Sequence, residues 1–437
     1  MKEELDRSPA KAGAQSPRNW TPAFAGEQKG AGEQKGAGEQ KGAGEQKGAG
    51  EQKGAGEQKG AGEQKGGAAA PLRLLLTTDA VGGVWQYSID LARGLAGHGV
   101  ETVIVVIGPS PSKAQVKHAA GIEGATLVDT GLPLDWVART RASVRGAGAA
   151  IAKLASSHAV DLVQLHAPAL AAEAKFPVPV VAFAHSCLAT WWQAVKETEV
   201  DGPWKWRSDL VAKGYRAADL VVAPSGAFAA ATHAAHRLEA PPLTVHNGRS
   251  PLALPRVASH DFAFTAGRLW DKAKNVRTLD AAAGRLAVPF YAAGPERGPS
   301  GDAIALEHAR GLGSLGEKEV ARWLAARPVF ASAAVYEPFG LAVLEAAAAE
   351  CPLVLSDIPT FRELWDGAAT FVDAMDDKGF AAAIGRIIGD DLLRAQLGAA
   401  AKERAARYTP DAMAARMAEL YRRLAAKPAD PAEQVAA

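Results

Sequence analysis

The chain has 437 residues, with 49 Lys and Arg against 48 Asp and Glu and a formal net charge of +1. This balance gives no bulk electrostatic attraction to nucleic acid or acidic membranes, so we expect no nucleic-acid partner. The two cysteines, Cys187 and Cys351, provide no disulfide framework and are typical of a reducing compartment.

A six-residue repeat dominates the first 70 residues. Its unit, Gly-Ala-Gly-Glu-Gln-Lys, contains no apolar residue larger than Ala. Such a segment cannot bury enough surface to offset the entropy lost on folding, so residues 1–70 are predicted to be a disordered low-complexity tail. A tandem expansion of the coding DNA or a start site assigned too far upstream would explain the tail, and a tether is the functional alternative. The sequence does not decide whether the tail belongs to the working protein.

The chain shows neither the apolar core of a signal peptide near its start nor a long uncharged apolar run further on. We therefore expect no transmembrane helix and a cytoplasmic location. Peripheral contact with the inner face of a membrane is left open.

Residues 71–250 are predicted to form one α/β domain. Short apolar runs, typical of buried parallel strands, alternate there with helical stretches. This alternation indicates a doubly wound, Rossmann-like parallel sheet. The predicted strands are Leu72–Thr78, Glu101–Ile107, Leu162–Leu165, Val178–Phe183 and Leu220–Val222, and the first helix is Val84–Ala96.

A second cycle of the same kind follows a proline-rich stretch, so residues 251–408 are predicted to form a second Rossmann-like domain that faces the first across a cleft. Residues 409–425 are predicted to form a last amphipathic helix, and residues 426–437 are predicted to be a frayed tail. The predicted strands are Phe262–Ala266, Val288–Ala292, Val329–Ala331 and Leu353–Ser356. The predicted helices are Val276–Leu286, Glu317–Ala326, Leu341–Glu350 and Gly379–Gly389.

The most informative motif places Glu337 and Glu345 eight positions apart, on either side of Pro-Phe-Gly-Leu. A helix is predicted to begin here, with Pro338 suited to its first turn. Glu337 should lie in the loop before the helix and Glu345 about two turns further along. Because a helix N-terminus attracts phosphate, the two carboxylates could hold hydroxyls on both sides of a diphosphate. The plainer alternative is that Glu345 is solvated and Glu337 is a loop cap.

This motif, carried on Glu-Pro-Phe-Gly-Leu, resembles the donor-site signature of family-4 retaining glycosyltransferases (glycosyl transferases group 1), which have the GT-B fold. The resemblance runs from about residue 72 to residue 424. It implies that Glu337 contacts the donor sugar and Glu345 the ribose, with Phe339, Gly340 and Leu341 at the diphosphate. It also implies that the first domain binds the acceptor, the second binds the nucleotide-sugar, and the terminal helix crosses back to the first domain.

Two cations precede the Glu motif, six residues apart, and this spacing indicates a site for the donor diphosphate. Arg268 follows Gly267 at the end of the first strand of the second domain, and Lys274 comes six residues later. A departing diphosphate needs fixed positive charge, and in the resembled family an Arg and a Lys supply it. The family often has Lys-Gly where this chain has Lys274-Asn275, and Lys272 is a second candidate for the Lys. The alternative is two solvated surface cations.

Glycines and a histidine complete the predicted donor site. Gly82 and Gly83 join a strand to a helix, and in the resembled family such a loop faces the donor phosphates. Gly294 matches the family's small-residue turn beside the nucleobase. His185 ends a predicted strand, where α/β sites gather, and in the family a His here touches the donor sugar. His166 has the same kind of position with weaker support.

Other residues are open at this stage. Trp191, Trp192, Trp204 and Trp206 could stack on an acceptor or pack in the core, and the sequence favours neither. Asn247 resembles part of the family's Asn-Gly pair before the interdomain linker and is interpreted as structural. The Gly-x-Gly-x-x-Gly fingerprint of nicotinamide-binding domains is missing, which argues against a dehydrogenase.

The resemblance thus implies a retaining hexosyltransferase, with His185, Glu337, Arg268 and Lys274 as catalytic residues. Its donor is a nucleoside-diphosphate sugar, and no cofactor, metal site or obligatory metal is expected. The acceptor is a glycan, lipid or small molecule, and a role in polysaccharide biosynthesis rests on fold-level analogy alone. The alternatives are a nucleotide-sugar epimerase and a catalytically inactive binding subunit, both on the GT-B fold. Donor, acceptor, linkage and oligomeric state are not determined.

Overall fold

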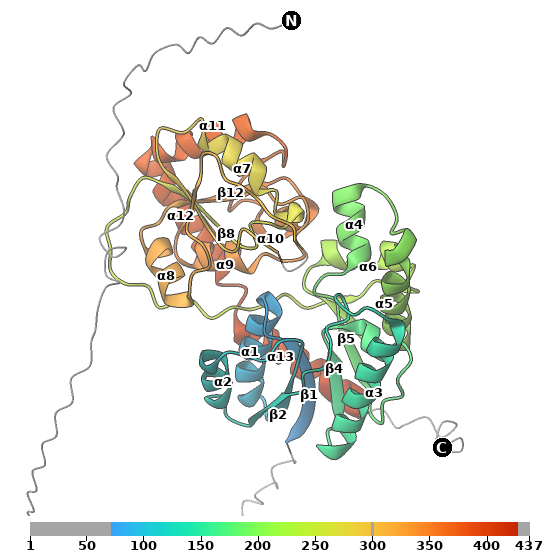
Figure 1. The fold of residues 1–437 in the computed structure, drawn as a ribbon. Helices are drawn as coiled ribbons and strands as arrows, with labels where there is room; N and C mark the ends of the chain where they lie inside the picture. The colour runs from blue at the N-terminus through green and yellow to red at the C-terminus, as the bar shows by residue number, and fades with distance from the viewer. Residues whose placement is uncertain (1–70, 299–300, 427–437) are drawn as a thin grey trace, which may run out of the picture. The chain divides into compact units, whose positions relative to one another are not determined.

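The computed structural model describes residues 71–298 and 301–426. The predicted repeat tail of residues 1–70 lies outside the described residues, as do residues 427–437 of the predicted terminal tail. Two parallel sheets form the described part, each with helices packed on both of its faces (Figure 1). The two predicted Rossmann-like domains are therefore confirmed as a fold class, while their boundaries stay predictions.

The strands of the first sheet are β1 (Leu72–Asp79), β2 (Val100–Ile107), β3 (Ala125–Asp129), β4 (Leu162–Leu165), β5 (Val180–Phe183), β6 (Leu220–Ala223) and β7 (Leu243–Thr244). They pair in parallel in the order β3-β2-β1-β4-β5-β6-β7. Side chains alternate between the faces, so Leu74 and Leu76 enter one core while Leu75 enters the other. Apolar layers on both faces explain the unbroken apolar runs of these strands.

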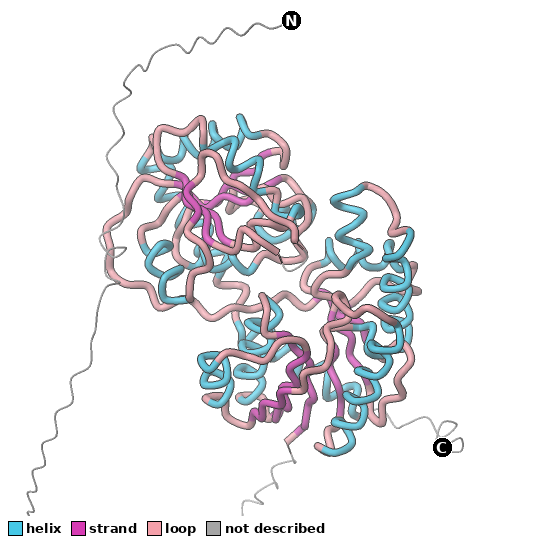
Figure 2. The backbone as a smooth tube through the Cα atoms, viewed as in Figure 1, coloured by secondary structure: helices cyan, strands magenta, loops and turns pink. Residues whose placement is uncertain are grey.

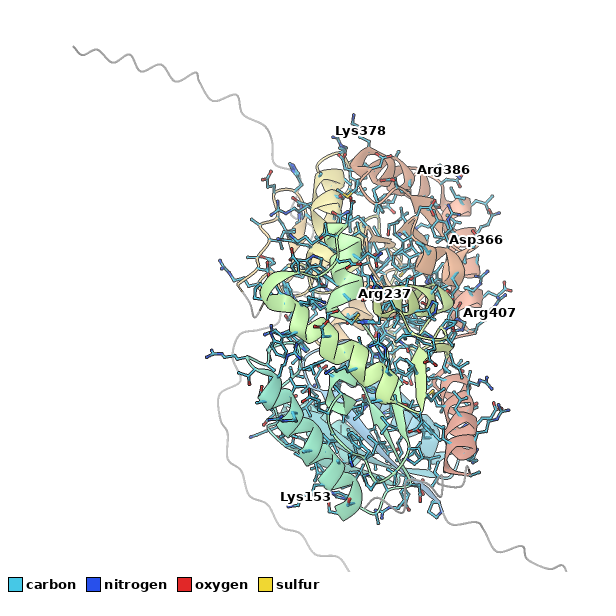
Figure 3. All side chains as sticks on the ribbon, turned by 90° about the vertical axis from the view of Figure 1, so that its right-hand side faces the viewer. Lys153, Arg237, Asp366, Lys378, Arg386 and Arg407 are labelled. Carbon is cyan, nitrogen blue, oxygen red and sulfur yellow. The ribbon has the colours of Figure 1, made fainter. Side chains whose placement is uncertain are left out.

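The helices between these strands are α1 (Gly83–Ala96), α2 (Lys113–Ala120), α3 (Arg141–Ser157), η1 (Pro168–Ala171), α4 (Leu188–Lys196), η2 (Gly202–Trp204), α5 (Lys205–Ala217) and α6 (Gly226–His236). One face of the sheet packs against α1, and the opposite face packs against α3, η1 and α5. Their outer sides are charged, as at Lys153 of α3 (Figure 3).

The strands of the second sheet are β8 (Ala263–Ala266), β9 (Phe290–Ala293), β10 (Arg310–Gly311), β11 (Val329–Ser332), β12 (Leu353–Ser356) and β13 (Thr370–Val372). Their parallel order, β10-β9-β8-β11-β12-β13, repeats the topology of the first sheet. Figure 2 shows the strands in magenta among the helices that cover them. The accompanying helices are η3 (Lys272–Lys274), α7 (Val276–Ala283), α8 (Glu317–Ala325), α9 (Leu341–Ala348), α10 (Pro359–Trp365), α11 (Asp377–Ile388) and α12 (Asp391–Ala405).

The last described helix, α13 (Pro410–Ala425), packs on the first sheet although it follows the second in the chain. Met413, Met417 and Tyr421 are buried beside α1 and the strands β1, β4 and β5. Tyr421 also donates a hydrogen bond to Oε1 of the buried Gln164 at the centre of that sheet. The core of the first domain is therefore completed from the C-terminal end of the chain.

Most predicted elements lie within a few residues of those observed, but several were missed. The edge strands β3, β7, β10 and β13 are short or half-exposed, so they lack the apolar run of a central strand. The whole of α12 was missed because its sequence has few large apolar residues; its Gly398 packs closely on the backbone of Glu350 instead. In residues 71–298 and 301–426, no helix has the length and apolar character needed to cross a membrane.

The strand order locates the expected ligand site. In each sheet the order reverses between two adjacent strands, β1 and β4 in the first and β8 and β11 in the second. Ligands of doubly wound sheets bind outside the carboxyl ends of the strands at this point. The loops that leave β1, β8 and β11 carry Gly82, Arg268 and Glu337, respectively.

Candidate active site

A cavity of about 400 Å³ is lined by residues from both domains. It lies at the carboxyl ends of strands in both sheets, where the topology predicts a ligand. Of the residues predicted for the donor site, those that line it are Gly82, Gly83, His185, Gly267, Arg268, Lys274, Glu337, Phe339, Gly340, Leu341 and Glu345. Gly294 is the predicted residue that does not line it.

The N-terminus of α9 opens into this cavity. Gly340 is the N-cap with φ +96°, a left-handed conformation that favours glycine. The helix begins at Leu341, so the prediction that Pro338 occupies its first turn was wrong; Pro338 belongs to the loop before the cap. Leu341, Ala342 and Val343 line the cavity. Because the first N–H groups of a helix have no intrahelical acceptor, they can donate to a bound anion.

Glu337 forms an ion pair with Lys274 inside the cavity. The side chains are 16% and 22% exposed, respectively, so neither is a solvated surface charge. Lys272, the other candidate, is exposed and does not line the cavity. Asn275 has φ +48°, which explains how it stands where the resembled family has Gly, since Asn tolerates this conformation.

Glu345 takes part in a buried network centred on Arg249 of the interdomain linker. The Arg249 guanidinium is 6% exposed and contacts Glu345 at 2.8 Å, Asp90 of α1 at 3.2 Å and Glu317 of α8 at 3.0 Å. Burial raises the pKa of both Asp90 and Glu345, while Arg249 lowers it. The alternative of a solvated Glu345 is therefore wrong. Arg249 was not predicted, because it belongs to no recognisable sequence motif.

Arg268 lines the same cavity. Its Nη2 lies 2.9 Å from Oδ2 of the buried Asp271, whose Oδ1 accepts a hydrogen bond of 3.2 Å from Nε1 of Trp191 in the first domain. Arg268 and the hydrogen bonds to Asp271 lower the pKa of that carboxyl against the opposing effect of burial. Half of the Arg268 side chain stays exposed, so its remaining N–H groups can contact a ligand.

Two glycine turns shape the walls of the site. The first is held by Asp79, whose Oδ1 accepts a hydrogen bond of 2.8 Å from the Val81 N–H. A Cβ at Gly82 would meet nothing closer than Arg268, at 4.0 Å. A Cβ at Gly294, in contrast, would stand 1.7 Å from the backbone oxygen of Gly267. Gly294 thus supports the Arg268 loop from behind instead of facing the cavity.

The two strand-end histidines differ in their hydrogen bonding. His166 contacts Ser88 at 3.3 Å and Gln164 at 2.8 Å through its two ring nitrogens. His185 stacks on Phe183, with ring centroids 4.4 Å apart, and its buried Nε2 has no partner among the described residues. Burial lowers the pKa of His185 to about 3, so the ring is neutral near pH 7. A neutral ring with one unpartnered nitrogen beside a cavity is suited to contact a ligand.

Asn247 was interpreted as structural, yet it lines the cavity and its buried Oδ1 has no partner among the described residues. Tyr336, which was not predicted, also lines it; its hydroxyl lies 2.8 Å from Oγ1 of Thr190. The sequence position of Asn247, a polar residue shortly after a strand, could have predicted its place in the site. No sequence pattern predicts the place of Tyr336, because its hydrogen-bond partner Thr190 is far away in the chain.

A second cavity of about 380 Å³ adjoins the first and shares His185, Gly82 and Arg268 with it. Trp192 lies outside it and donates a hydrogen bond to Thr198. The four tryptophans of the predicted cluster thus differ in position, since Trp191, Trp204 and Trp206 line the cavity and Trp192 does not. The tryptophans that line the second cavity are Trp136, Trp191, Trp204, Trp206 and Trp270.

The second cavity also contains charged groups that the sequence analysis missed. Asp135 is among them, and burial, reinforced by the nearby Asp79 carboxylate, raises its pKa to about 6. The Arg207 guanidinium lies over the rings of Trp204 and Trp206, 4.8 and 4.4 Å from their centroids. It donates a hydrogen bond of 2.6 Å to the backbone oxygen of Ala138, and its buried Nε has no partner among the described residues.

Two Rossmann-like domains that share a cavity at their switch points define a GT-B protein. Residues 81–251 match Glycosyltransferase Family 4, and residues 261–390 match Glycosyl transferases group 1. The chain belongs to the family-4 glycosyltransferases of the GT-B fold.

Curated relatives match over part of their length. A D-inositol 3-phosphate glycosyltransferase of Corynebacterium urealyticum is 33% identical over 31% of this chain and 36% of the relative. A phosphatidyl-myo-inositol mannosyltransferase of Mycolicibacterium smegmatis is 41% identical over 20% of this chain and 22% of the relative. The matched part is thus well under half of each relative.

Solved structures match the fold more completely. Sucrose-phosphate synthase from Thermosynechococcus elongatus has a TM-score of 0.66 at 18% identity, over 81% of this chain and 99% of the other. Anabaena HepE, solved in complex with UDP-glucose, has a TM-score of 0.63 at 18% identity, over 81% of this chain and 100% of the other. Likeness at this identity establishes the shared fold.

Proposed function

We propose that this protein transfers a hexose from a nucleoside-diphosphate sugar to a hydroxyl of an acceptor, with retention of configuration. The observation that carries the proposal is the single cavity in which Arg268, Lys274, Glu337 and Glu345 surround the N-terminus of α9. Cations and a helix N-terminus suit a diphosphate, and carboxylates on two sides suit hydroxyls. Family membership and the glycosyltransferase names of the relatives support the same activity.

In this proposal the diphosphate lies on the N–H groups at the start of α9, between Arg268 and Lys274. Glu337 accepts hydrogen bonds from the donor sugar, and Glu345 accepts them from the ribose. Both carboxylates are held by cations in the described structure, Glu337 by Lys274 and Glu345 by Arg249. The donor therefore enters a site whose charged groups already have fixed positions, which lowers the cost of ordering them.

The reaction replaces one bond to the anomeric carbon with another. The bond from that carbon to the diphosphate oxygen breaks, its electron pair leaves with the diphosphate, and the acceptor oxygen forms the new bond. The acceptor proton passes to the departing diphosphate. Arg268, Lys274 and the N-terminus of α9 stabilise the negative charge that develops there, which is the role that a metal ion fills in other transferases. We propose that no metal ion is required.

The test is nucleotide release from a panel of UDP-, GDP- and ADP-hexoses by the full chain, with and without a chelator. We expect slow turnover of one donor, unaffected by the chelator. Glu337→Gln and Arg268→Ala should lower turnover by about 100-fold or more, because each removes a contact to the donor where charge develops. If no nucleotide is released even after a lipid, glycan or small-molecule alcohol is added as acceptor, although free nucleoside diphosphates bind in calorimetry, the chain is an inactive binding subunit and the proposal is wrong. Strong inhibition by the chelator would overturn metal independence alone.

A further inference from the structure

The second cavity has a largely apolar lining. Beside its five tryptophans it is lined by aliphatic side chains from four separate elements and loops, among them Ile107, Leu134, Val144 and Leu210. Trp136 and Trp204 are 46% and 43% exposed, an unusual state for the largest apolar side chains. Exposed aromatic rings that line a cavity beside an active site indicate an apolar ligand that covers them.

The charges of the second cavity do not suit an anion. Its Asp and Arg lining consists of two carboxylates, Asp79 and Asp135, and two guanidinium groups, Arg207 and Arg268. Burial lowers the pKa of the two histidines that also line it, His166 and His185, so they add no positive charge near pH 7. Arg268 lines the donor cavity as well, where the proposed function assigns it to the diphosphate. Arg207 is held on two indole rings and on a backbone oxygen. A phosphate placed here would face two carboxylates with one largely committed cation to balance it.

Hydrogen bonding in the cavity matches an alcohol. Arg207 Nε is a buried donor without a partner among the described residues, and the Asp135 carboxylate accepts hydrogen bonds once ionised. A hydroxyl can accept from the first and donate to the second at the same time. His185 lines both cavities and so marks where the acceptor and the donor sugar meet.

We infer that the acceptor is a neutral, largely apolar alcohol with a ring system, not a phosphorylated inositol or a glycan. This inference rests on the proposed function and goes beyond it in naming the acceptor class. The proposed acceptor differs from the inositol phosphate and the phosphatidyl-myo-inositol in the names of the curated relatives, because each of those carries a phosphate. Trp136 and Trp204 bind the ring system, and Asp135 and Arg207 position the hydroxyl.

The test is a binding assay on the full chain saturated with the nucleoside diphosphate that calorimetry identifies. The probes are 2-naphthalenemethanol and naringenin as neutral alcohols, myo-inositol 1-phosphate as an anion and cellobiose as a glycan. Tryptophan fluorescence reports binding. We expect saturable quenching by the neutral alcohols, with Kd at least about 10-fold below those of the other probes, because aromatic stacking and apolar burial favour them.

Substitutions test whether the neutral alcohols bind in the second cavity. Trp136→Ala should raise the Kd of 2-naphthalenemethanol by about 10-fold through the loss of one stacking surface. Trp192→Ala, whose indole lies outside the cavity, is the matched control and should leave it unchanged. Asp135→Asn should raise the acceptor KM more than it lowers kcat.

Each failure has a distinct meaning. Tighter binding of myo-inositol 1-phosphate or cellobiose, or an unchanged Kd in Trp136→Ala, would overturn the inference while nucleotide binding still supports a donor site. Loss of nucleotide binding itself would overturn the proposed function instead.

Discussion

Lys274 and Lys272 lie two residues apart in one short 3-10 helix, yet only Lys274 reaches the donor cavity. We predict that Lys274→Met lowers kcat by about 100-fold, because a cation at the developing diphosphate charge is lost. Lys272→Met, which changes an exposed cation of the same kind, should leave kcat within about twofold, as is usual for surface changes. Steady-state kinetics with the active donor would measure both. Equal losses in the two variants would show that bulk charge, and not the position of Lys274, matters.

His185 offers a prediction on the pH dependence of stability. Its pKa is lowered from 6.5 in the unfolded chain to about 3 in the folded protein by burial. Between these two pKa values the folded state binds fewer protons than the unfolded chain. The free energy of unfolding therefore keeps its full value, as far as His185 is concerned, above about pH 6.5 and decreases as pH falls towards 3. His166 is shifted in the same direction.

We therefore expect the melting temperature of His185→Gln to fall less steeply than that of the wild type between about pH 7 and pH 4.5. Differential scanning calorimetry across this range measures the two slopes. Parallel slopes would contradict the assignment of a buried neutral imidazole at this position.

At the scale of elements, the two glycine turns of the donor site differ in what requires them. Gly294→Ala would place a Cβ 1.7 Å from the Gly267 oxygen and displace the loop of Arg268. Gly82→Ala has room within the protein, so any demand for glycine there comes from a ligand.

We predict that Gly294→Ala lowers the melting temperature by several degrees, since a backbone clash of this kind costs about 1–3 kcal/mol. Gly82→Ala should keep its melting temperature and bind the nucleoside diphosphate more weakly. Thermal shift assays with and without nucleotide separate the two effects. A Gly82→Ala protein with unaltered nucleotide affinity would show that the donor phosphates do not approach this loop.

The sequence predicts elements well where local signals suffice and poorly where they do not. Central strands such as β4 and β12 were predicted with their exact bounds because they are apolar runs buried on both faces. The edge strands and α12 lack such patterns. The Glu motif and the Arg-Lys spacing are local, and the structure brings all four side chains to one cavity. Asp135 and Trp270 reach the second cavity from loops far apart in sequence, so no local pattern predicts their meeting.

At the scale of the whole described part, Arg249 connects the domains. Its guanidinium joins α1, α8 and α9 through three carboxylates, one of which, Asp90, is fully buried. Removing the cation takes the Arg249 contact from Glu345 and from the buried Asp90, which keeps Gln86, Ser250 and Arg93 as partners. We predict that Arg249→Met lowers the free energy of unfolding by about 3–5 kcal/mol at neutral pH.

The pH dependence of this variant has a definite sign. The pKa of Asp90 and of Glu345 is already raised by burial in the wild type, and it rises further once Arg249 is gone. A carboxyl with a raised folded-state pKa contributes stability that grows as pH falls, so Arg249→Met should recover part of its loss as the pH is lowered from neutral. The double variant Arg249→Met with Asp90→Asn should be more stable than Arg249→Met alone. Denaturant unfolding at several pH values tests both, and a pH-independent loss would contradict the network.

The most direct test of the account is a crystal structure of the full chain with the nucleoside diphosphate that binds it. We predict that the diphosphate lies on the N–H groups of Leu341 and Ala342 between Arg268 and Lys274, with the ribose hydroxyls on Glu345. A nucleotide bound elsewhere, or one bound here with its phosphates away from Arg268 and Lys274, would contradict the proposed donor site.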